Sequence, residues 1–210
     1  MTGTIALGVF SLLLSFVNLD VPLYSQMPMY PTACESVATV ASLNYLGYDI
    51  TIDEFLDSYL PTVSFGDERV AESDYNIFDY YFVGNPRTYG GWLCNPPVIV
   101  GAVQNYFFDT GEHWFSAYDY TGVNFNFLLD EVAQGRPVVI WVTQGFEDSA
   151  FVDLMGNPYC AKNHAVVLSG YDRTRGVVMI TDSIDGRYEV DYYKAKSVFD
   201  FAGKRSVVFK

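Results

Sequence analysis

Hydrophobic periodicity predicts a helix that carries a cysteine near its start. Four apolar residues follow Thr32 broadly at helical spacing: Val37, Val40, Ala41 and Leu43. The letters "TACE" at 32–35 form a capping box, in which Thr32 and Glu35 each bond the other's backbone amide. Gly47 supplies a stop at the C-terminal end. The pattern therefore predicts a helix capped by Thr32, with Cys34 at its second helical position.

Three further helices are expected before the pattern changes. A second capping box, "TIDE" at 51–54, predicts a short helix that ends before Pro61. Prolines at 96–97 suit a first helical turn and predict a helix over 96–107, and "VNFNFLLDEVAQG" predicts one that Gly135 closes. Residues 62–95 are rich in Gly, Asn, Asp and Tyr, so we expect loops there.

The rest of the chain predicts strands. Short runs rich in β-branched residues are separated by turn residues: "RPVVIWVTQ", "HAVVLSGY", "GVVMITD", "GRYEVDYY" and "RSVVF". Helices first and a mostly antiparallel sheet afterwards indicate an α+β fold. No linker, low-complexity segment or internal repeat interrupts the chain, so residues 19–210 are expected to form a single domain.

The first 18 residues allow two interpretations. Ile5–Val17 is an almost unbroken apolar run, shorter than the roughly 20 residues of a membrane span but of the length of a signal-peptide core. Neither a preceding Lys or Arg nor a clear cleavage site accompanies it. Residues 1–18 are therefore interpreted as a signal peptide or a first strand, without a stable membrane span. Export to the cell surface or medium is favoured over a cytoplasmic location.

Composition narrows the function classes. Half of the residues are apolar and 18% are charged, which is typical of a folded globular protein. A net charge of −13 repels phosphate backbones, so no nucleic-acid partner is expected. The three cysteines form no C-x-x-C pair and there are only two histidines, so neither a metal nor a cofactor is expected. In an exported protein, an odd count suggests a Cys94–Cys160 disulfide with Cys34 free; the alternative is three reduced thiols.

Cys34 is the candidate nucleophile. First-turn amides lack intrahelical partners and the helix dipole adds partial positive charge, so both stabilise a thiolate. Cysteines at such positions reach pKa values of roughly 3.5–7.5. The alternative is a small buried apolar residue.

His164 and Asp182 are candidates for the base and its orienting group. His164 opens one predicted strand, Asp182 closes the next, and the turn "DRTRG" joins them. In a hairpin, side chains opposite each other lie roughly 4.5–5.5 Å apart at Cβ, close enough for a carboxylate to orient an imidazole. His113 lies in a loop and is expected at the surface. Gln26, eight residues before Cys34, could donate to an oxyanion together with the Cys34 amide.

These motifs resemble those of papain-like cysteine peptidases, and more closely the bacteriocin-leader-processing (double-glycine) peptidases and their stand-alone C39-like relatives. The matching segments run in the family's order from Leu19 to the C-terminus: "LDVPLYSQ", "TACESVATVASLNYLGY", "GNP" at 84–86, "GRPVVIWV", "NHAVVLSGYD" and "VMITDSIDG". The spacing from cysteine to histidine, 164 − 34 = 130, also suits papain-type enzymes.

The resemblance implies a papain-like fold in which an N-terminal helical part packs on the C-terminal sheet. It implies Cys34 as nucleophile, His164 as general base and acid, Asp182 as orienting group and Gln26 as oxyanion donor. Two residues depart from the family pattern: Glu35 stands where relatives commonly have a small residue, and Ser183 where proline often follows the aspartate. No G-x-x-x-x-G-K-[ST] motif is present, which favours a stand-alone hydrolase over a transporter-coupled one.

Three functions stay open at this point. The first is a thiol hydrolase that cleaves peptide bonds in a peptide or protein substrate. The second is a non-catalytic binding module of the same fold, with the loops at 62–95 covering the cleft. The third is an amidase or transpeptidase of cell-wall peptides, which would use the same residues. Trp92 and Trp141 are expected to pack in the core or to line the groove.

Overall fold

An antiparallel sheet of seven strands forms the centre of the computed structural model, which describes residues 14–71 and 76–210. Six strands follow one another across the sheet: β10 (Gly186–Asp191), β9 (Val177–Asp182), β8 (Asn163–Asp172), β5 (Val138–Thr143), β11 (Ser206–Phe209) and β4 (Ala117–Asp119). The seventh, β1 (Phe16–Asn18), pairs with the far end of β8. The five strands predicted from β-branched runs are therefore confirmed.

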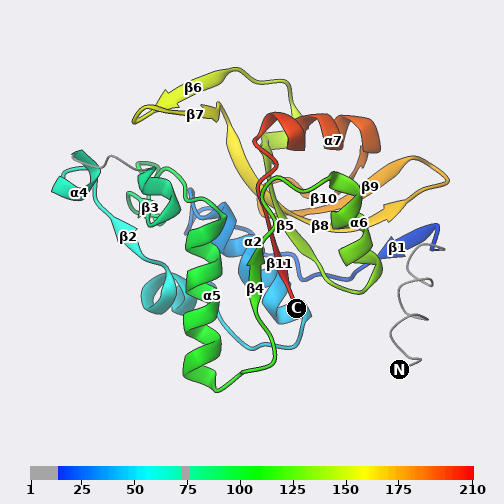
Figure 1. Cartoon of the computed structure of the whole chain (residues 1–210), viewed down its shortest axis with the longest axis horizontal. Helices are drawn as coiled ribbons and strands as arrows, with labels where there is room; N and C mark the ends of the chain where they lie inside the picture. Colours follow the sequence, from blue (N-terminus) through cyan, green and yellow to red (C-terminus); the bar gives the residue numbers. More distant parts are fainter. Residues whose placement is uncertain (1–13, 72–75) are drawn as a thin grey trace.

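Helices and short strands surround this sheet (Figure 1). The first half holds α2 (Cys34–Tyr45), α3 (Ile52–Glu54) with a π turn (Phe55–Tyr59), α4 (Glu68–Ala71), a 3₁₀ turn (Ile77–Asp79) and α5 (Pro96–Thr110). Between them, β2 (Thr62–Val63) and β3 (Phe82–Val83) pair in parallel. The second half holds α6 (Phe125–Ala133), a 3₁₀ turn (Gln144–Phe146), the hairpin of β6 (Phe151–Leu154) and β7 (Asn157–Cys160), and α7 (Tyr192–Phe201). The α+β prediction is confirmed.

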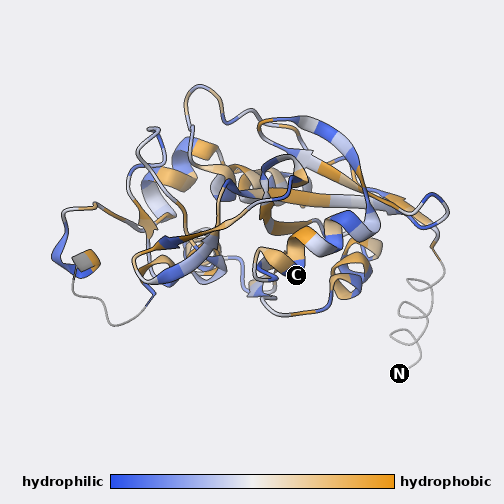
Figure 2. Cartoon of the chain, turned by 90° about the horizontal axis from the view of Figure 1, so that it is seen from above, coloured by the Kyte–Doolittle hydropathy of each residue, from blue (hydrophilic) through white to orange (hydrophobic). Residues whose placement is uncertain are grey.

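Strand β5 divides the core in two. Its residues alternate between the faces of the sheet, as the geometry of a strand requires. Val139 and Trp141 pack with α2 and α5, whereas Val138, Ile140 and Val142 pack with α6 and α7. Because both faces are covered, all six residues of β5 are buried. Figure 2 shows the hydrophobic residues along these central strands.

The start of α2 differs from the predicted capping box. Ala33 occupies the N-cap without a side-chain bond, and Cys34 is the first helical residue. The Thr32 hydroxyl donates instead to the Thr88 carbonyl at 3.0 Å. The loop at 84–91 lies so close that a Cβ on Gly91 would be 2.3 Å from that hydroxyl oxygen. The second capping box is correct in its main bond, because Thr51 accepts from the Glu54 amide at 3.1 Å.

Helix α7 was not predicted from the sequence. The strand pattern was extended through residues 186–193, but the chain leaves the sheet after Asp191. The Asp191 carboxylate accepts from the Lys194 amide at 3.0 Å and so caps a new helix. Ala195, Val198 and Phe199 then face the core at helical spacing.

The N-terminal segment adds an edge to the sheet. Residues 5–13 of the apolar run lie outside the described residues, so their interpretation as a signal peptide stays a prediction. Residues 16–18 of the segment form β1, in which Val17 lies opposite Tyr171 of β8. The Leu19 amide continues the pairing to the Ser169 carbonyl at 2.8 Å. Of the helices in the described residues, none has the length and apolar character to span a membrane.

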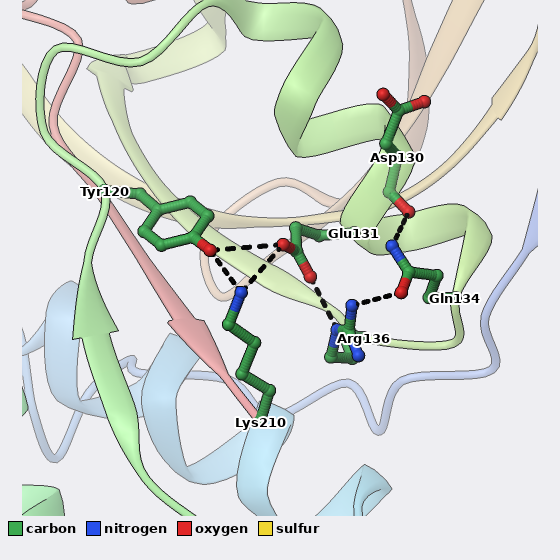
Figure 3. A network of polar contacts seen from close by, with 6 residues as sticks. All are labelled: Tyr120, Asp130, Glu131, Gln134, Arg136 and Lys210. Carbon is green, nitrogen blue, oxygen red and sulfur yellow. Dashed lines mark hydrogen bonds and ion pairs between the residues drawn. The ribbon is translucent and has the colours of Figure 1, made fainter. Parts of the chain in front are cut away.

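A buried carboxylate fastens the end of β11 to α6 (Figure 3). Glu131 of α6 accepts from Arg136 at 2.5 Å and from Lys210 at 3.1 Å. Tyr120 completes the group by bonding Glu131 at 3.3 Å and by accepting from Lys210. This network joins Glu131 of α6 to residues that follow β4, α6 and β11, and it includes none of the candidate catalytic residues.

Candidate active site

Cys34 begins α2 and is almost fully enclosed, with 7% of its surface exposed. Its thiol donates to Glu35 Oε2, with 3.4 Å between sulfur and oxygen. Glu35 is completely buried, and its second oxygen accepts the Cys94 amide at 3.2 Å. The glutamate therefore points into the protein beside the thiol instead of turning back to cap the helix.

The electrostatics of Cys34 oppose the expected low pKa. Burial raises the pKa of the thiol well above its usual value, and the negative charge of Glu35 raises it further. The backbone amides of Ala165 and Glu35 lower it, but by less. The predicted stabilisation of a thiolate at the helix start is thus wrong for this state, because packing against β8 removes water and the neighbouring residue is a carboxyl. The raised pKa favours the protonated thiol.

His164 and Asp182 form the predicted pair. The imidazole Nε2 lies 2.8 Å from Asp182 Oδ1, and both side chains are buried. His164 and Asp182 are not directly opposite each other in the β8–β9 pair. Val167 pairs with Thr181, so Asp182 lies opposite residue 166, and His164 is two residues away on the same face of the sheet. Since Nε2 faces Asp182, Nδ1 is the nitrogen left for a sulfur.

Asp182 is held by three further donors. Its Oδ1 accepts the Ile184 amide at 2.8 Å and the Asp185 amide at 3.4 Å, and its Oδ2 accepts the Tyr188 hydroxyl at 2.8 Å. Burial alone would raise the pKa of Asp182, but the hydrogen bond and charge of His164 outweigh it, aided by these donors, and lower that pKa. The carboxylate therefore stays ionised and can stabilise an imidazolium.

Gln26 is buried and fixed at both ends of its amide. Its Nε2 donates to the Pro31 carbonyl at 2.9 Å, and its Oε1 accepts the Ser183 hydroxyl at 2.6 Å. The backbone amide of Gln26 also donates to the Ser183 carbonyl at 3.1 Å. The side chain thereby joins the segment that precedes Cys34 to the residue that follows Asp182. One N–H of Nε2 is left for another acceptor.

The four candidate residues are brought together in pairs. His164 bonds Asp182, and Gln26 bonds the neighbour of Asp182. Cys34 lies beside the amide of Ala165, the residue after His164. In the described part of the chain, however, the sulfur bonds Glu35 and makes no hydrogen bond to His164. A bond between Cys34 and His164 would require the thiol to give up its bond to Glu35.

Three residues of this site were not assigned from the sequence: Glu35, Ser183 and Tyr188. Two of them gave a signal, since Glu35 and Ser183 are the positions that depart from the family pattern. Tyr188 gave none, because one tyrosine among 17 is not distinctive. His113 is exposed, as expected.

Of the two alternatives for the cysteines, the structure shows three reduced thiols and no Cys94–Cys160 disulfide. Cys34, Cys94 and Cys160 are all free and buried. The thiol of Cys160 lies 3.6 Å from Asn163 Oδ1, whereas Cys94 belongs to the core cluster around α2 and α5. Trp141 donates to the Cys94 carbonyl at 3.0 Å and is fully buried, so it packs in the core. Trp92 is 39% exposed and packs against Phe65.

A cavity lies next to the loop that contacts Thr32, just before the start of α2. It measures about 620 Å³, and its wall includes Val63, Phe65 and residues 84–88. The same loop accepts the Thr32 hydroxyl, two residues before Cys34. In the described part of the chain, no three His, Cys, Asp or Glu side chains are arranged to hold a metal ion.

Solved structures of known proteins share this architecture. A Bacillus anthracis protein described as a C39-like peptidase has 22% identity and a TM-score of 0.77, over 93% of this chain and 97% of that one. Digestive procathepsin L 3 from the larval midgut of Tenebrio molitor has 16% identity and a TM-score of 0.51, over 93% and 69%. A double glycine motif protease from an AMS/PCAT transporter, solved in complex with the leader peptide, has 14% identity and a TM-score of 0.46, over 92% of this chain and 91% of that one. The fold is that of the papain-like cysteine peptidases.

The sequence identifies the family within this class. The model of the Peptidase_C39 like family matches residues 18–206, and the chain belongs to that family. It is therefore a cysteine peptidase, and the resemblance noted in its motifs is confirmed. No curated protein gives a significant match to the chain.

Proposed function

We propose that this peptidase hydrolyses peptide bonds with Cys34 as nucleophile and His164 as general base and acid. The bond between His164 Nε2 and the buried, ionised Asp182 carries the proposal, because it fixes the ring and leaves Nδ1 for the sulfur. Cys34 begins a helix that packs against the same strand, β8, beside the Ala165 amide.

The mechanism begins with a movement of the thiol. The Cys34 proton passes to His164 Nδ1, and Asp182 stabilises the resulting imidazolium. The sulfur attacks the scissile carbonyl, and the oxyanion accepts from the free N–H of Gln26 Nε2 and from the Cys34 amide. His164 then gives its proton to the leaving amine, and water hydrolyses the thioester.

The proposed substrate is a peptide or a protein segment in an extended conformation. The 620 Å³ cavity beside the loop at 84–88 is large enough for side chains of such a segment and lies close to the first turn of α2. Phe65 and Val63 give this wall an apolar part, whereas Arg87 and Asp57 give it charge.

Labelling with a thiol-directed probe near neutral pH tests the assignment of Cys34. We expect Cys34→Ala to abolish labelling and peptide cleavage. Cys160→Ala is the matched control, since it removes another buried free thiol and leaves Cys34 in place. Undiminished labelling of the Cys34→Ala protein excludes Cys34 as the reactive thiol.

A non-catalytic binding module is the second candidate, and the state of the thiol favours it. A cysteine with 7% of its surface exposed and a thiol of raised pKa is a poor nucleophile. Thiol reactivity measured against pH separates the two functions. Reactivity that appears only at or above the ordinary thiol pKa of about 8.5, without peptide cleavage, supports the binding module.

A cell-wall amidase or transpeptidase would use the same four residues. The fate of the acyl-enzyme distinguishes these reactions, since an added amine competes with water only in a transpeptidase. Mass spectrometry of the products from defined peptides, with and without an acceptor amine, decides between them.

A further inference from the structure

Glu35 is a buried acid in direct contact with the proposed nucleophile, and the mechanism above gives it no role. Its two oxygens accept the Cys34 thiol at 3.4 Å and the Cys94 amide at 3.2 Å. None of its surface is exposed. A carboxyl placed there without function would be costly, because burial strongly disfavours its charged form.

The titratable groups that face Glu35 come from three elements. Cys34 lies on the same helix, Cys94 comes from the segment before α5, and the charge of His164 on β8 reaches Glu35 as well. In the described part of the chain, no Lys or Arg side chain forms an ion pair with Glu35. Among the described residues, the negative charge of Glu35 is therefore stabilised by hydrogen bonds from the Cys34 thiol and the Cys94 amide. The imidazolium form of His164 adds a positive charge.

The charge of Glu35 decides which form of the nucleophile is favoured. When Glu35 is ionised, its carboxylate accepts a hydrogen bond from the Cys34 thiol. A thiolate beside this carboxylate would place two negative charges in contact within the core. When Glu35 is protonated, its O–H can donate to the sulfur, and a thiolate accepts such a bond better than a thiol does. The imidazolium of His164 then balances the sulfur, as in the proposed mechanism.

We propose that Glu35 is a proton-linked partner of Cys34, which holds the resting thiol when ionised and donates a hydrogen bond to the thiolate when protonated. The inference rests on the proposed function. The change takes up one proton from solvent onto Glu35, while the proton of Cys34 passes to His164 Nδ1. No atom is oxidised or reduced, and no other reactant takes part.

Glu35 changes its protonation state within the pH range in which the protein can be assayed. Burial raises the pKa of Glu35 to about 7, although the amides of Glu35 and Cys94 and the thiol of Cys34 lower it in part. Below that pH the protonated acid favours the thiolate, and above it the carboxylate favours the thiol. Peptidase activity should therefore decline as pH rises through neutrality.

The rate of alkylation of Cys34 by iodoacetamide between pH 5 and pH 9 tests this role without a known substrate. In the wild-type protein we expect the rate constant to fall about tenfold from pH 6 to pH 8, as the protonated fraction of a group with a pKa of about 7 does. In Glu35→Gln the side-chain amide can still bond the Cys94 amide and donate to the sulfur at every pH. We expect this variant to lose the fall and to react faster than wild type at pH 8.

Glu131→Gln is the matched control, since it removes another buried glutamate that bonds Arg136 and Lys210 instead of the thiol. Its profile should keep the wild-type fall. A wild-type rate that rises steadily with pH overturns the inference, and this result needs no variant to fold. A Glu35→Gln profile that matches wild type overturns it as well. If either of these results is found while labelling stays confined to Cys34 and peptide cleavage is intact, the role of Glu35 is wrong but the proposed function stands. Labelling that persists in Cys34→Ala contradicts the proposed function itself.

Discussion

Asp182→Asn and Asp182→Ala are expected to differ in effect, because the donors around the carboxylate fix how an asparagine can sit. The His164 ring and the Ile184 amide both donate to Oδ1, so the amide oxygen must occupy that position. The amide nitrogen then faces the Tyr188 hydroxyl, which can turn to accept. Asparagine thus keeps the contacts and removes only the charge.

The magnitudes follow from the strength of the bond to the imidazolium. A hydrogen bond that involves a charged group contributes about 1.5–3 kcal/mol, and a neutral bond about 0.5–1.5 kcal/mol. Asp182→Ala loses the whole bond and should reduce the thiolate–imidazolium population by about 10- to 150-fold. Asp182→Asn loses about 1 kcal/mol, which corresponds to a reduction of about fivefold.

Alkylation by iodoacetamide at one fixed pH measures this population, since the protonated thiol dominates the resting state and the rate follows the minor thiolate form. Circular dichroism of each variant should verify that the fold is intact. Tyr188→Phe provides an internal control: combined with Asp182→Asn, it leaves a buried amide hydrogen without an acceptor. We expect the combination to lose about 1–3 kcal/mol more stability than the two single changes together.

An Asp182→Ala protein that reacts within twofold of wild type would refute the reasoning. The short bond between His164 and Asp182 would then be structural only. Equal losses for Asp182→Asn and Asp182→Ala would instead refute the argument that Tyr188 accepts the asparagine amide.

Three further predictions concern other parts of the site. Gln26→Ala should lower kcat by about 10²–10³ through loss of an oxyanion donor but change the alkylation rate of Cys34 less than threefold, and unchanged kcat would refute this role. Gly91→Ala should destabilise the protein in urea unfolding, because the new Cβ would lie 2.5 Å from the Asn85 carbonyl oxygen. Gly101→Ala, whose Cβ would have no atom within 4 Å, should instead stabilise helix α5 by up to about 1 kcal/mol. Equal effects of the two changes would show that the close contact at Gly91 does not matter. Glu35→Gln should remove a fall in stability on the order of 3 kcal/mol between pH 4 and pH 8. The folded pKa of about 7 exceeds the ordinary value of 4.5, so the folded protein binds more protons than the unfolded chain and loses stability as pH rises. Urea titrations at both pH values test this, and an equal fall in the variant would contradict it.

The strands of this fold could be predicted because their signal is local. Runs such as "VVIWV" and "HAVVLSGY" are typical of fully buried strands and have few other structures open to them. The turn between β8 and β9 is also short. That short turn also brought His164 and Asp182 together in the prediction, since few registers separate them. Helix α7 was missed because its apolar spacing begins only at Ala195, after tyrosines that continue the strand pattern.

The state of Cys34 could not be predicted, because it depends on residues far along the chain. Burial by β8 involves positions about 130 residues away in the sequence, and no local pattern reports it. The capping box at Thr32 failed for a similar reason: the Thr88 carbonyl, 56 residues on, competes for the hydroxyl. Glu35 was then free to turn inward. The same four letters describe a cap or a buried acid, and only tertiary packing chooses between them.

The position of β11 has a consequence for how the enzyme is made. This strand lies inside the sheet between β5 and β4, as Figure 1 shows. A ribosome delivers Cys34 and His164 long before it delivers Ser206–Phe209. Until those residues arrive, β5 and β4 expose unpaired edges, and the newly made polypeptide cannot close its sheet. The nascent polypeptide thus completes this sheet only after Ser206–Phe209 has been synthesised.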